Sequence, residues 1–481
     1  MPYDALADFL EELAAGEELL RISAEVDGDL EIAEITRRVA EQRGPALLFD
    51  RVRGRSLAVV TNLLGTPARA CRALGLDSLD EMATRVAAII EQNTPQNWFD
   101  RLKMSADDGS AGKLRPKAAK AGVCQQVVRL GRDVDLATFP LLKAWPGESG
   151  PAITAGTLIT EDRQNNIRGA TLTPLVALDE NRLAVVDDGH SVFSRHWSAH
   201  RAAGQRLPLA VVVGGDPIRT LAASLELPAE IDFYHLCGLL RTRPLEVVKC
   251  RTHGLEVPAE ADFVFEGYLD PEVPDVNVEA AAAAGSHYRV SLPSPVFHLT
   301  AVTHRSRPLF PAIIDSGSTG EAGVLVQARE RMLVPLLRSV APDLVDLYLT
   351  AFGGWQRVAF VSIRKQHPFQ ARQIAAALWG TNALRFTKFL VLVDERIDVH
   401  NIEQVLGQMG AHVAPERDLF SLDGPAHASD HANTLGALAR HVAIDATTKL
   451  PAEQSTKSPS PLDAGHDIRQ QVTARWPEYR L

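Results

Sequence analysis

The stretch that decides the fold is residues 266–287, EGYLDPEVPDVNVEAAAAAGSH. Its first residues close the apolar run 262–266, which is typical of a strand, and the prolines and acids that follow predict a loop. This loop runs into five consecutive alanines and stops at Gly285. Glu279, just before the alanines, either belongs to a site on this loop or begins a helix, where a carboxylate suits the dipole.

Short predicted strands separated by turns lie on both sides of this stretch. A turn at residues 179–181 predicts a hairpin. Two predicted helices, at roughly 194–203 and 228–241, interrupt the series of strands. The clearest strands are 127–130, 153–159, 171–178, 183–186, 209–213, 245–250 and 297–303. Many short strands at such spacing predict a barrel or a sandwich.

The N-terminal part mixes helices and short strands. Residues 4–15 predict an amphipathic helix with Asp4 as its cap, and a half-buried strand follows at 20–26. Asp29 is expected to cap a second helix, and residues 78–81 form a capping box for another. These elements predict a small α/β domain.

The C-terminal part returns to an α/β pattern after a polar linker at 104–122 and the strand-rich middle. Predicted helices are 324–340, 369–379 and 402–409, and predicted strands are 346–350, 358–363 and 389–393. A Pro/Ser-rich linker at 451–466 precedes a last helix near 467–476. We expect that helix to dock elsewhere on the protein or on a partner chain.

Composition excludes several classes of function. The chain has 481 residues, enough for two to four domains, and a net charge of −10, which does not favour nucleic acid as a partner. The N-terminus lacks the basic start of a signal peptide, and no apolar run is long enough for a membrane helix. We therefore expect a cytoplasmic protein without a membrane segment. The cysteines are far apart without a CxxC, which predicts buried thiols instead of a disulfide frame or a zinc site; they are Cys71, Cys124, Cys237 and Cys250.

Four short motifs are considered as candidate sites. His196 and His200 lie four apart on a predicted helix and either share a metal or lie on a solvated helix face. Residues 214–217 predict a turn, whereas 316–320 form either an anion-binding loop or a plain surface loop. Residues 187–190 place two carboxylates and an imidazole in one turn, which is a metal-capable cluster.

Several long segments resemble the UbiD family of decarboxylases, which use prenylated FMN. The matching segments are 6–39, 44–54, 61–75, 127–156, 245–271, 385–399 and 443–451. The resemblance implies an N-terminal α/β domain (1–118), a central split β-barrel of the flavin-reductase kind that binds flavin (119–305), and a C-terminal α/β domain (306–481). It also implies a homodimer or larger assembly in which the last helix reaches a neighbour.

The family chemistry implies a carboxylate clamp and a proton donor. In the family the donor is a Glu in the loop after the EGY strand, and an Arg from a hairpin is the clamp. Here the donor position falls on Asn277, so Glu279, two residues later, is the implied acid, while the second family Glu falls on Ala282. Placing the hairpin at residues 163–165 gives Arg168 as the clamp.

The same resemblance implies residues for the cofactor and for a divalent metal, manganese, on the flavin phosphate. Placing the hairpin on residues 181–183 puts Gly169 and Pro174 at the metal Asn and the clamp, whereas the alternative placement on 163–165 puts Asn165 and Arg168 there. Phe233 occupies the position of the metal Glu. The implied metal ligands are Asn165, His190 and Asp232, and the implied cofactor contacts are Lys388, Ala222, Ala223 and Ser224.

Three functions follow from these implications. The first is a carboxy-lyase that reversibly decarboxylates an aromatic or α,β-unsaturated acid, with a flavin prenyltransferase supplying the cofactor. The second is a non-catalytic subunit that assists a second UbiD-like chain. The third is a UbiD scaffold reused for other chemistry.

Overall fold

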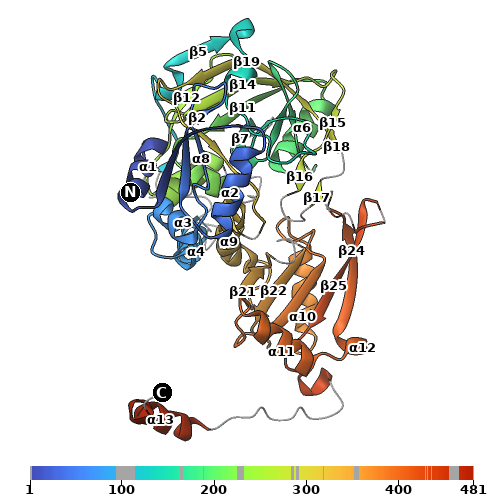
Figure 1. Cartoon of the computed structure of the whole chain (residues 1–481). Helices are drawn as coiled ribbons and strands as arrows, with labels where there is room; N and C mark the ends of the chain where they lie inside the picture. Colours follow the sequence, from blue (N-terminus) through green and yellow to red (C-terminus); the bar gives the residue numbers. More distant parts are fainter. Residues whose placement is uncertain are drawn as a thin grey trace.

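The structure is a computed structural model. It describes residues 3–93, 114–162, 166–187, 189–224, 232–282, 287–288, 292–317, 319–351, 357–427, 430, 432–434, 436–453 and 465–479. Figure 1 shows an N-terminal α/β part packed beside a central curled sheet, with a second α/β body below them. The expected mixture of α/β and β-rich parts is therefore present.

The N-terminal part is built on a four-stranded sheet. The sheet order is β1-β2-β3-β20, and β20 (Phe310–Ala312) joins it by pairing in parallel with β3. The long helix α9 (Gly320–Leu337) packs against the helices of this part. The other elements are α1 (Leu6–Ala15), β1 (Leu19–Val26), α2 (Glu31–Glu41), β2 (Ala46–Val52), β3 (Val59–Thr61), α3 (Pro67–Leu74) and α4 (Leu79–Asn93).

The central part is a nine-stranded sheet in which every neighbouring pair of described strands is antiparallel. Its order is β6-β9-β10-β19-β14-β11-β7-β8, with β5 paired to β19. The strands are β5 (Val127–Leu130), β6 (Ala152–Ile153), β7 (Thr157–Glu161), β8 (Arg168–Leu172), β9 (Leu175–Ala177), β10 (Arg182–Val185), β11 (Leu207–Val213), β14 (Phe263–Leu269) and β19 (Val296–His304). The expected hairpin is β9–β10.

Helices and small sheets cover this curled sheet. The helices are α6 (Val192–Ala202), α7 (Ile218–Ala223) and α8 (Phe233–Arg241). The small strands are β4 (Lys117–Ala118), β12 (Glu246–Lys249), β13 (Glu256–Pro258), β15 (Val276–Val278), β16 (Ala281–Ala282), β17 (His287–Tyr288) and β18 (Leu292–Ser294). Phenylalanines of both β14 and β19 are fully buried, so the sheet encloses its own apolar core.

The C-terminal body has a five-stranded sheet of order β21-β22-β23-β25-β24. Its elements are β21 (Leu344–Leu349), β22 (Val358–Ile363), α10 (Gln370–Trp379), β23 (Phe389–Asp394), α11 (Ile402–His412), α12 (Pro415–Asp418), β24 (Leu419–Pro425) and β25 (Leu438–Asp445). The sequence patterns did not predict β24 or β25. On β24 most side chains are exposed, so the apolar alternation of a half-buried strand is weak there.

The last helix, α13 (His466–Arg475), confirms the expected helix near the C-terminus. Figure 1 draws it apart from the C-terminal sheet, and its described side chains are exposed. Most of the predicted linkers at 104–122 and 451–466 lie outside the described residues. In the part of the chain that the structure describes, no helix is both long enough and apolar enough to cross a bilayer.

Several local predictions were wrong. Asp4 does not cap α1, because Ala5 is the N-cap and the Asp4 carboxylate pairs with Arg243. Asp29 does not cap α2, which begins after Leu30 in a left-handed conformation. The helix start considered at Glu279 is also wrong, because Ala281 and Ala282 form β16 and pair with β17.

The two histidines of α6 lie on neither a metal site nor a solvated face. His196 and His200 are both buried, and His196 Nδ1 lies 2.8 Å from the Thr160 hydroxyl. Burial lowers the pKa of His196 to about 4, so the ring is neutral near pH 7. His200 Nδ1 contacts the His196 carbonyl at 2.9 Å. Both rings therefore serve the packing of α6 on the sheet.

Candidate functional site

The candidate site lies where β8, at one end of the described central sheet, meets helices α6, α7 and α8. Gly169 on β8 permits the close approach of α6, because a Cβ there would lie 2.1 Å from Val192 Cγ1. Ser191 caps α6 and Asp232 caps α8, so both helices begin near this strand. Helix N-termini carry partial positive charge, which favours an anionic group at such a place.

Arg168, the predicted clamp, is the central charge of this site. Its Nε donates to Asp232 Oδ2 at 2.8 Å, and its Nη1 donates to Glu256 Oε2 at 2.8 Å. The guanidinium also lies over the ring of Tyr234, 4.9 Å from the centroid. Burial is the largest single influence and lowers the pKa of Arg168, but the hydrogen bond to Asp232 and the charges of Asp232, Tyr234 and Glu256 together raise it above its usual range. The side chain is therefore a fixed, oriented cation.

Asp232, predicted as a metal ligand, is fully engaged by protein donors. Its Oδ1 accepts from the backbone N–H groups of Tyr234 and His235 at 3.0 and 3.1 Å, which caps α8. Its Oδ2 accepts from Arg168. A carboxylate that is bonded to a guanidinium is a poor partner for a dication, because the two cations repel each other. The structure thus joins the predicted clamp to a predicted metal ligand.

Glu161 is a functional candidate that the sequence patterns did not reveal. It ends β7 and faces Arg168 in the β7–β8 register. Burial raises the pKa of Glu161 above its usual value; Arg168 opposes the shift, and the Glu256 and Asp232 carboxylates add to it. Its proton is therefore retained to higher pH than that of an ordinary glutamate. An acid that ends an otherwise apolar strand was the signal in the sequence for Glu161.

We call Glu161, Arg168, Asp232, Tyr234 and Glu256 the Arg168 cluster. It contains one permanent cation, two carboxylates that orient it, and one carboxyl group that burial biases towards the protonated form. A guanidinium carries more N–H donors than these two bonds use, so Arg168 can still bind a further anion. The cluster is thus able to hold an anionic group beside a proton donor.

Lys388, a predicted cofactor contact, lies in the C-terminal body just before β23. Its Nζ is 3.1 Å from both carboxylate oxygens of Asp430, which is buried. The side chain of Lys388 is 23% exposed, so the ammonium is still accessible from one side. An anionic ligand would have to share this cation with Asp430.

His190, the second predicted metal ligand, links the central part to the C-terminal body. Its ring packs against Phe386 with 4.8 Å between centroids, and its carbonyl accepts from Arg385 Nη2 at 3.0 Å. In the turn before it, Asp187 accepts a hydrogen bond from the Gly189 N–H. The described part of the 187–190 cluster therefore acts as a turn and an interdomain contact. The third predicted ligand, Asn165, lies outside the described residues.

The remaining predicted cofactor contacts end helix α7. Ala222 and Ala223 are buried in the core, so only their main chain is available to a ligand. The Ser224 hydroxyl donates to the Leu221 carbonyl at 2.6 Å, which leaves its oxygen as an acceptor only. Helix α7 contacts β8, so these residues pack beside the strand that carries Arg168.

Glu279, the predicted acid, lies on the loop after β15. Its N–H donates to Ser149 Oγ at 2.7 Å and its carbonyl accepts from the Ser149 N–H at 3.0 Å. These bonds fix the main chain and leave an exposed side chain. Glu279 and Arg168 share no hydrogen bond or ion pair with each other. The structure therefore does not join the two predicted catalytic residues.

Comparison with known proteins places the whole chain in one family. Residues 10–89, 116–318 and 323–446 match the N-terminal, Rift-related and C-terminal domain models of 3-octaprenyl-4-hydroxybenzoate carboxy-lyase. An uncharacterised protein of Aquifex aeolicus (strain VF5) is 34% identical over 477 residues, 98% of each chain.

Solved structures with the same fold include UbiD-class enzymes. HmfF from Pelotomaculum thermopropionicum in complex with FMN is 26% identical, with a TM-score of 0.77 over 96% of this chain and 98% of that one. An evolved dimeric HmfF in complex with prFMN gives the same identity and TM-score over 97% and 98% of the two chains. The closed form of vanillic acid decarboxylase from Sedimentibacter hydroxybenzoicus, at 22% identity, has a TM-score of 0.86 over 99% of each chain, which shows a shared fold. With three consecutive domain models matched and a relative aligned from end to end, this chain belongs to the UbiD family of carboxy-lyases.

Proposed function

We propose that this chain decarboxylates an aromatic or α,β-unsaturated carboxylic acid, with the Arg168 cluster as the polar end of its active site. The observation that carries the proposal is the partly buried guanidinium of Arg168, held at 2.8 Å by Asp232 and by Glu256 next to Glu161. Family membership supplies the reaction class. The split β-barrel of the flavin-reductase kind is our proposal for the curled central sheet.

The residues present fit the anionic end of a flavin nucleotide. Lys388 is a partly exposed cation, and the N-termini of α6 and α8 lie beside β8. The solved HmfF structures hold FMN and prFMN, which supports the same cofactor class here. When bound, a prenylated flavin accepts the electron pair that CO₂ leaves on an unsaturated carbon.

The residues present do not fit the predicted manganese ion. One carboxylate oxygen of Asp232 accepts a hydrogen bond from Arg168, and the other accepts from the backbone N–H groups that begin α8. The ring of His190 packs on Phe386. A dication at Asp232 would have to displace the guanidinium. We therefore assign no step to a metal at this site.

The protein's own contribution is to bind the substrate carboxylate and to deliver a proton. Arg168 binds the carboxylate through its unused N–H donors, while Asp232 and Glu256 prevent it from turning away. Glu161 carries the proton that replaces CO₂, because its raised pKa keeps it protonated at higher pH. Glu279 is the competing donor, and its exposed position would require the loop to close over the site.

The assembly we propose is a homodimer or a larger homo-oligomer. Apolar side chains of the C-terminal tail, Ile468, Val472, Trp476 and Tyr479, are 52%, 36%, 54% and 39% exposed, which is unusual for such residues in a lone helix. A neighbouring copy is the partner that would cover them. The further partners we propose are a small carboxylic acid substrate and a flavin prenyltransferase as the cofactor supplier.

The test is co-production with a flavin prenyltransferase, followed by assay. We expect protein with flavin absorbance that releases CO₂ from at least one member of a panel of aryl and α,β-unsaturated acids. The reverse reaction supplies a second readout, because labelled bicarbonate should exchange into the substrate carboxylate. Colourless protein that neither releases nor exchanges CO₂ would overturn the proposal.

A second candidate is a non-catalytic UbiD-like subunit. The exposed carboxylate of Glu279 and the engaged carboxylate of Asp232 favour it, because a catalytic chain should present both to a ligand. Co-production with an intact UbiD-like chain separates the two candidates. A subunit raises the activity of its partner and has none alone, whereas the proposed enzyme is active without a partner.

A further inference from the structure

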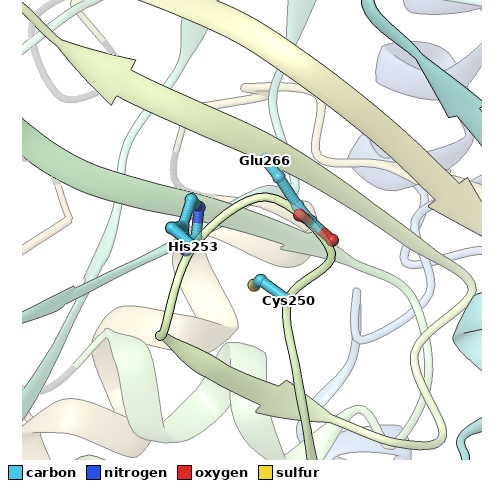
Figure 2. Close-up of side chains that lie close together, drawn as sticks. All are labelled: Cys250, His253 and Glu266. Atoms are coloured by element: carbon cyan, nitrogen blue, oxygen red, sulfur yellow. The ribbon is translucent and has the colours of Figure 1, made fainter.

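We propose that Cys250, His253 and Glu266 form a binding site for a zinc ion in the central part of the protein. One ligand atom from each of these residues lies within 4.8 Å of the others. Among the described residues, this is the group of three or more His, Cys, Asp or Glu side chains that is close enough to share a metal ion. None of the three belongs to the Arg168 cluster. Figure 2 shows the three side chains converging on a common space.

The β12–β13 loop and strand β14 carry the ligands. Cys250 directly follows β12, His253 lies three residues later in the loop to β13, and Glu266 lies within β14. The loop is fastened to the strand by Glu266 Oε2, which accepts from the N–H groups of Arg251 and Thr252 at 2.7 and 2.9 Å. This arrangement forms the site before any cation binds, which reduces the cost of ordering it.

Two buried polar atoms at the site have no protein partner. Glu266 is fully buried, and its Oε1 makes no hydrogen bond, although Oε2 makes three. His253 Nδ1 is likewise buried and unpaired. Buried polar groups in native proteins are almost always satisfied, and two unpaired acceptors facing one thiol match the ligand set that a bound cation needs. Figure 2 shows the carboxylate and the imidazole on either side of Cys250.

The histidine is prepared for a metal. Its Nε2 lies 3.2 Å from the Leu209 carbonyl, which fixes the proton on Nε2 and leaves the lone pair on Nδ1. A second hydrogen bond from a ligating histidine to a carbonyl is the usual arrangement around protein metals.

The chemical types of the three ligands favour zinc over cations that prefer oxygen ligands. A thiolate, an imidazole and a carboxylate suit Zn²⁺, whereas Mg²⁺, Ca²⁺ and Mn²⁺ prefer oxygen ligands. Ligands on a tetrahedral zinc lie about 3.6 Å apart, so the site must contract by up to about 1 Å. The loop has room for this movement, because Arg251 and Thr252 are exposed and no atom lies within 4 Å of a Cβ built on Gly254. His253 is only partly buried, so water can supply the fourth ligand.

A bound zinc ion would tie the β12–β13 loop to β14, the strand that leads to the loop of Glu279. The isolated cysteines, without a CxxC, did not predict a zinc site. The sequence does contain Cys-x₂-His at 250–253, but the third ligand comes from a different strand. Spacing along the chain cannot reveal such a ligand.

The test is a Co²⁺ titration of the full-length, chelator-treated protein without flavin, in a thiol-free reductant. We expect one equivalent of Co²⁺ to produce a thiolate-to-cobalt charge-transfer absorption that Zn²⁺ abolishes by displacement. Mn²⁺ should produce no displacement. Because only a sulfur ligand gives this band, a cation at a flavin phosphate cannot imitate it.

Variants locate the site. Cys250→Ser should abolish the band, and His253→Gln should weaken Co²⁺ binding by at least about tenfold, the loss that even an outer-shell contact causes. Cys71→Ser removes another buried thiol, on α3, and should leave the titration unchanged. Absence of the band in the wild type, or its persistence in Cys250→Ser, overturns the proposal. If circular dichroism shows that Cys250→Ser is unfolded, the wild-type titration and the His253→Gln variant test the proposal instead.

Discussion

The guanidinium of Arg168 and the carboxylate of Asp232 form an ion pair with 2.8 Å between Nε and Oδ2. The pair connects the first residue of β8 to the N-cap of α8 and is mostly shielded from solvent, with side-chain exposures of 16% and 22%. Partly buried pairs are screened less by salt than exposed ones, so this contact fixes the direction of the guanidinium. The ion pair also determines whether an anion or a cation can bind beside Asp232.

Replacing Arg168 by lysine should lower kcat/KM for CO₂ release by about 10²-fold, the cost of misplacing a positioning group. Lysine keeps the positive charge but cannot bond Asp232 and Glu256 at once through a planar fork. The measurement is steady-state kinetics on the best substrate of the panel.

The matched control is Arg182→Lys on β10. Arg182 pairs with Asp179 but is 46% exposed, and such surface pairs contribute little. We expect its kinetics to stay within about twofold of the wild type. If Arg168→Lys behaves like this control, Arg168 is not the clamp.

Manganese should not bind beside Asp232. The Arg168 guanidinium already neutralises that carboxylate, and a dication would meet a cation at 2.8 Å from the shared oxygen. Titrating metal-free protein into Mn²⁺ should leave the EPR signal of the free ion unchanged, and added Mn²⁺ should not raise the rate of decarboxylation. Loss of the free-ion signal that Asp232→Asn prevents would show that the metal displaces Arg168.

Glu161→Gln should reduce kcat by about 10²- to 10⁴-fold, whereas Glu279→Gln should change it only a few-fold. The two substitutions are matched in size and charge, and they differ in that Glu161 is partly buried beside Arg168 while Glu279 is exposed. Because the protonated carboxyl group is the active form, activity should fall as pH rises through the raised pKa of Glu161. The reverse ranking of the two variants would assign the proton to Glu279.

The sequence predicted most elements of the fold but little of the site's connectivity. Strongly patterned elements such as α9 and β23 were expected within a few residues, because apolar periodicity determines them directly. The pairing of Arg168 with Asp232 depends on how α8 packs on β8, which no local pattern encodes. The resemblance supplied both residues separately, as a clamp and as a metal ligand.

Local sequence patterns also could not predict which side chains are exposed. His196 and His200 looked like residues of a solvated face because imidazoles are polar, but the central sheet covers that face of α6. In the same way, the alanines after Glu279 favoured a helix, and pairing with β17 overrides that propensity at Ala281 and Ala282. Tertiary contacts decide both cases.

Glu321→Gln should stabilise the protein above neutral pH and leave it unchanged in acid. Glu321 lies in the first turn of α9 with 4% of its surface exposed, and burial raises its pKa from 4.5 to about 7. A folded-state pKa above the unfolded value means that the protonated form favours folding. This contribution is complete below about pH 4.5 and is lost as pH rises through about 7.

Glutamine imitates the protonated carboxyl group at every pH, so the gain in unfolding free energy at pH 8 should be up to about 3 kcal/mol. Urea unfolding at pH 5 and pH 8 measures it, with Glu11→Gln on the exposed face of α1 as the control that should show no gain. If Glu321→Gln destabilises equally at both pH values, Glu321 is ionised in the folded state. Hydrogen bonds from the Leu63 and Leu64 main chain, together with the charge of Arg69, would then outweigh the cost of burial.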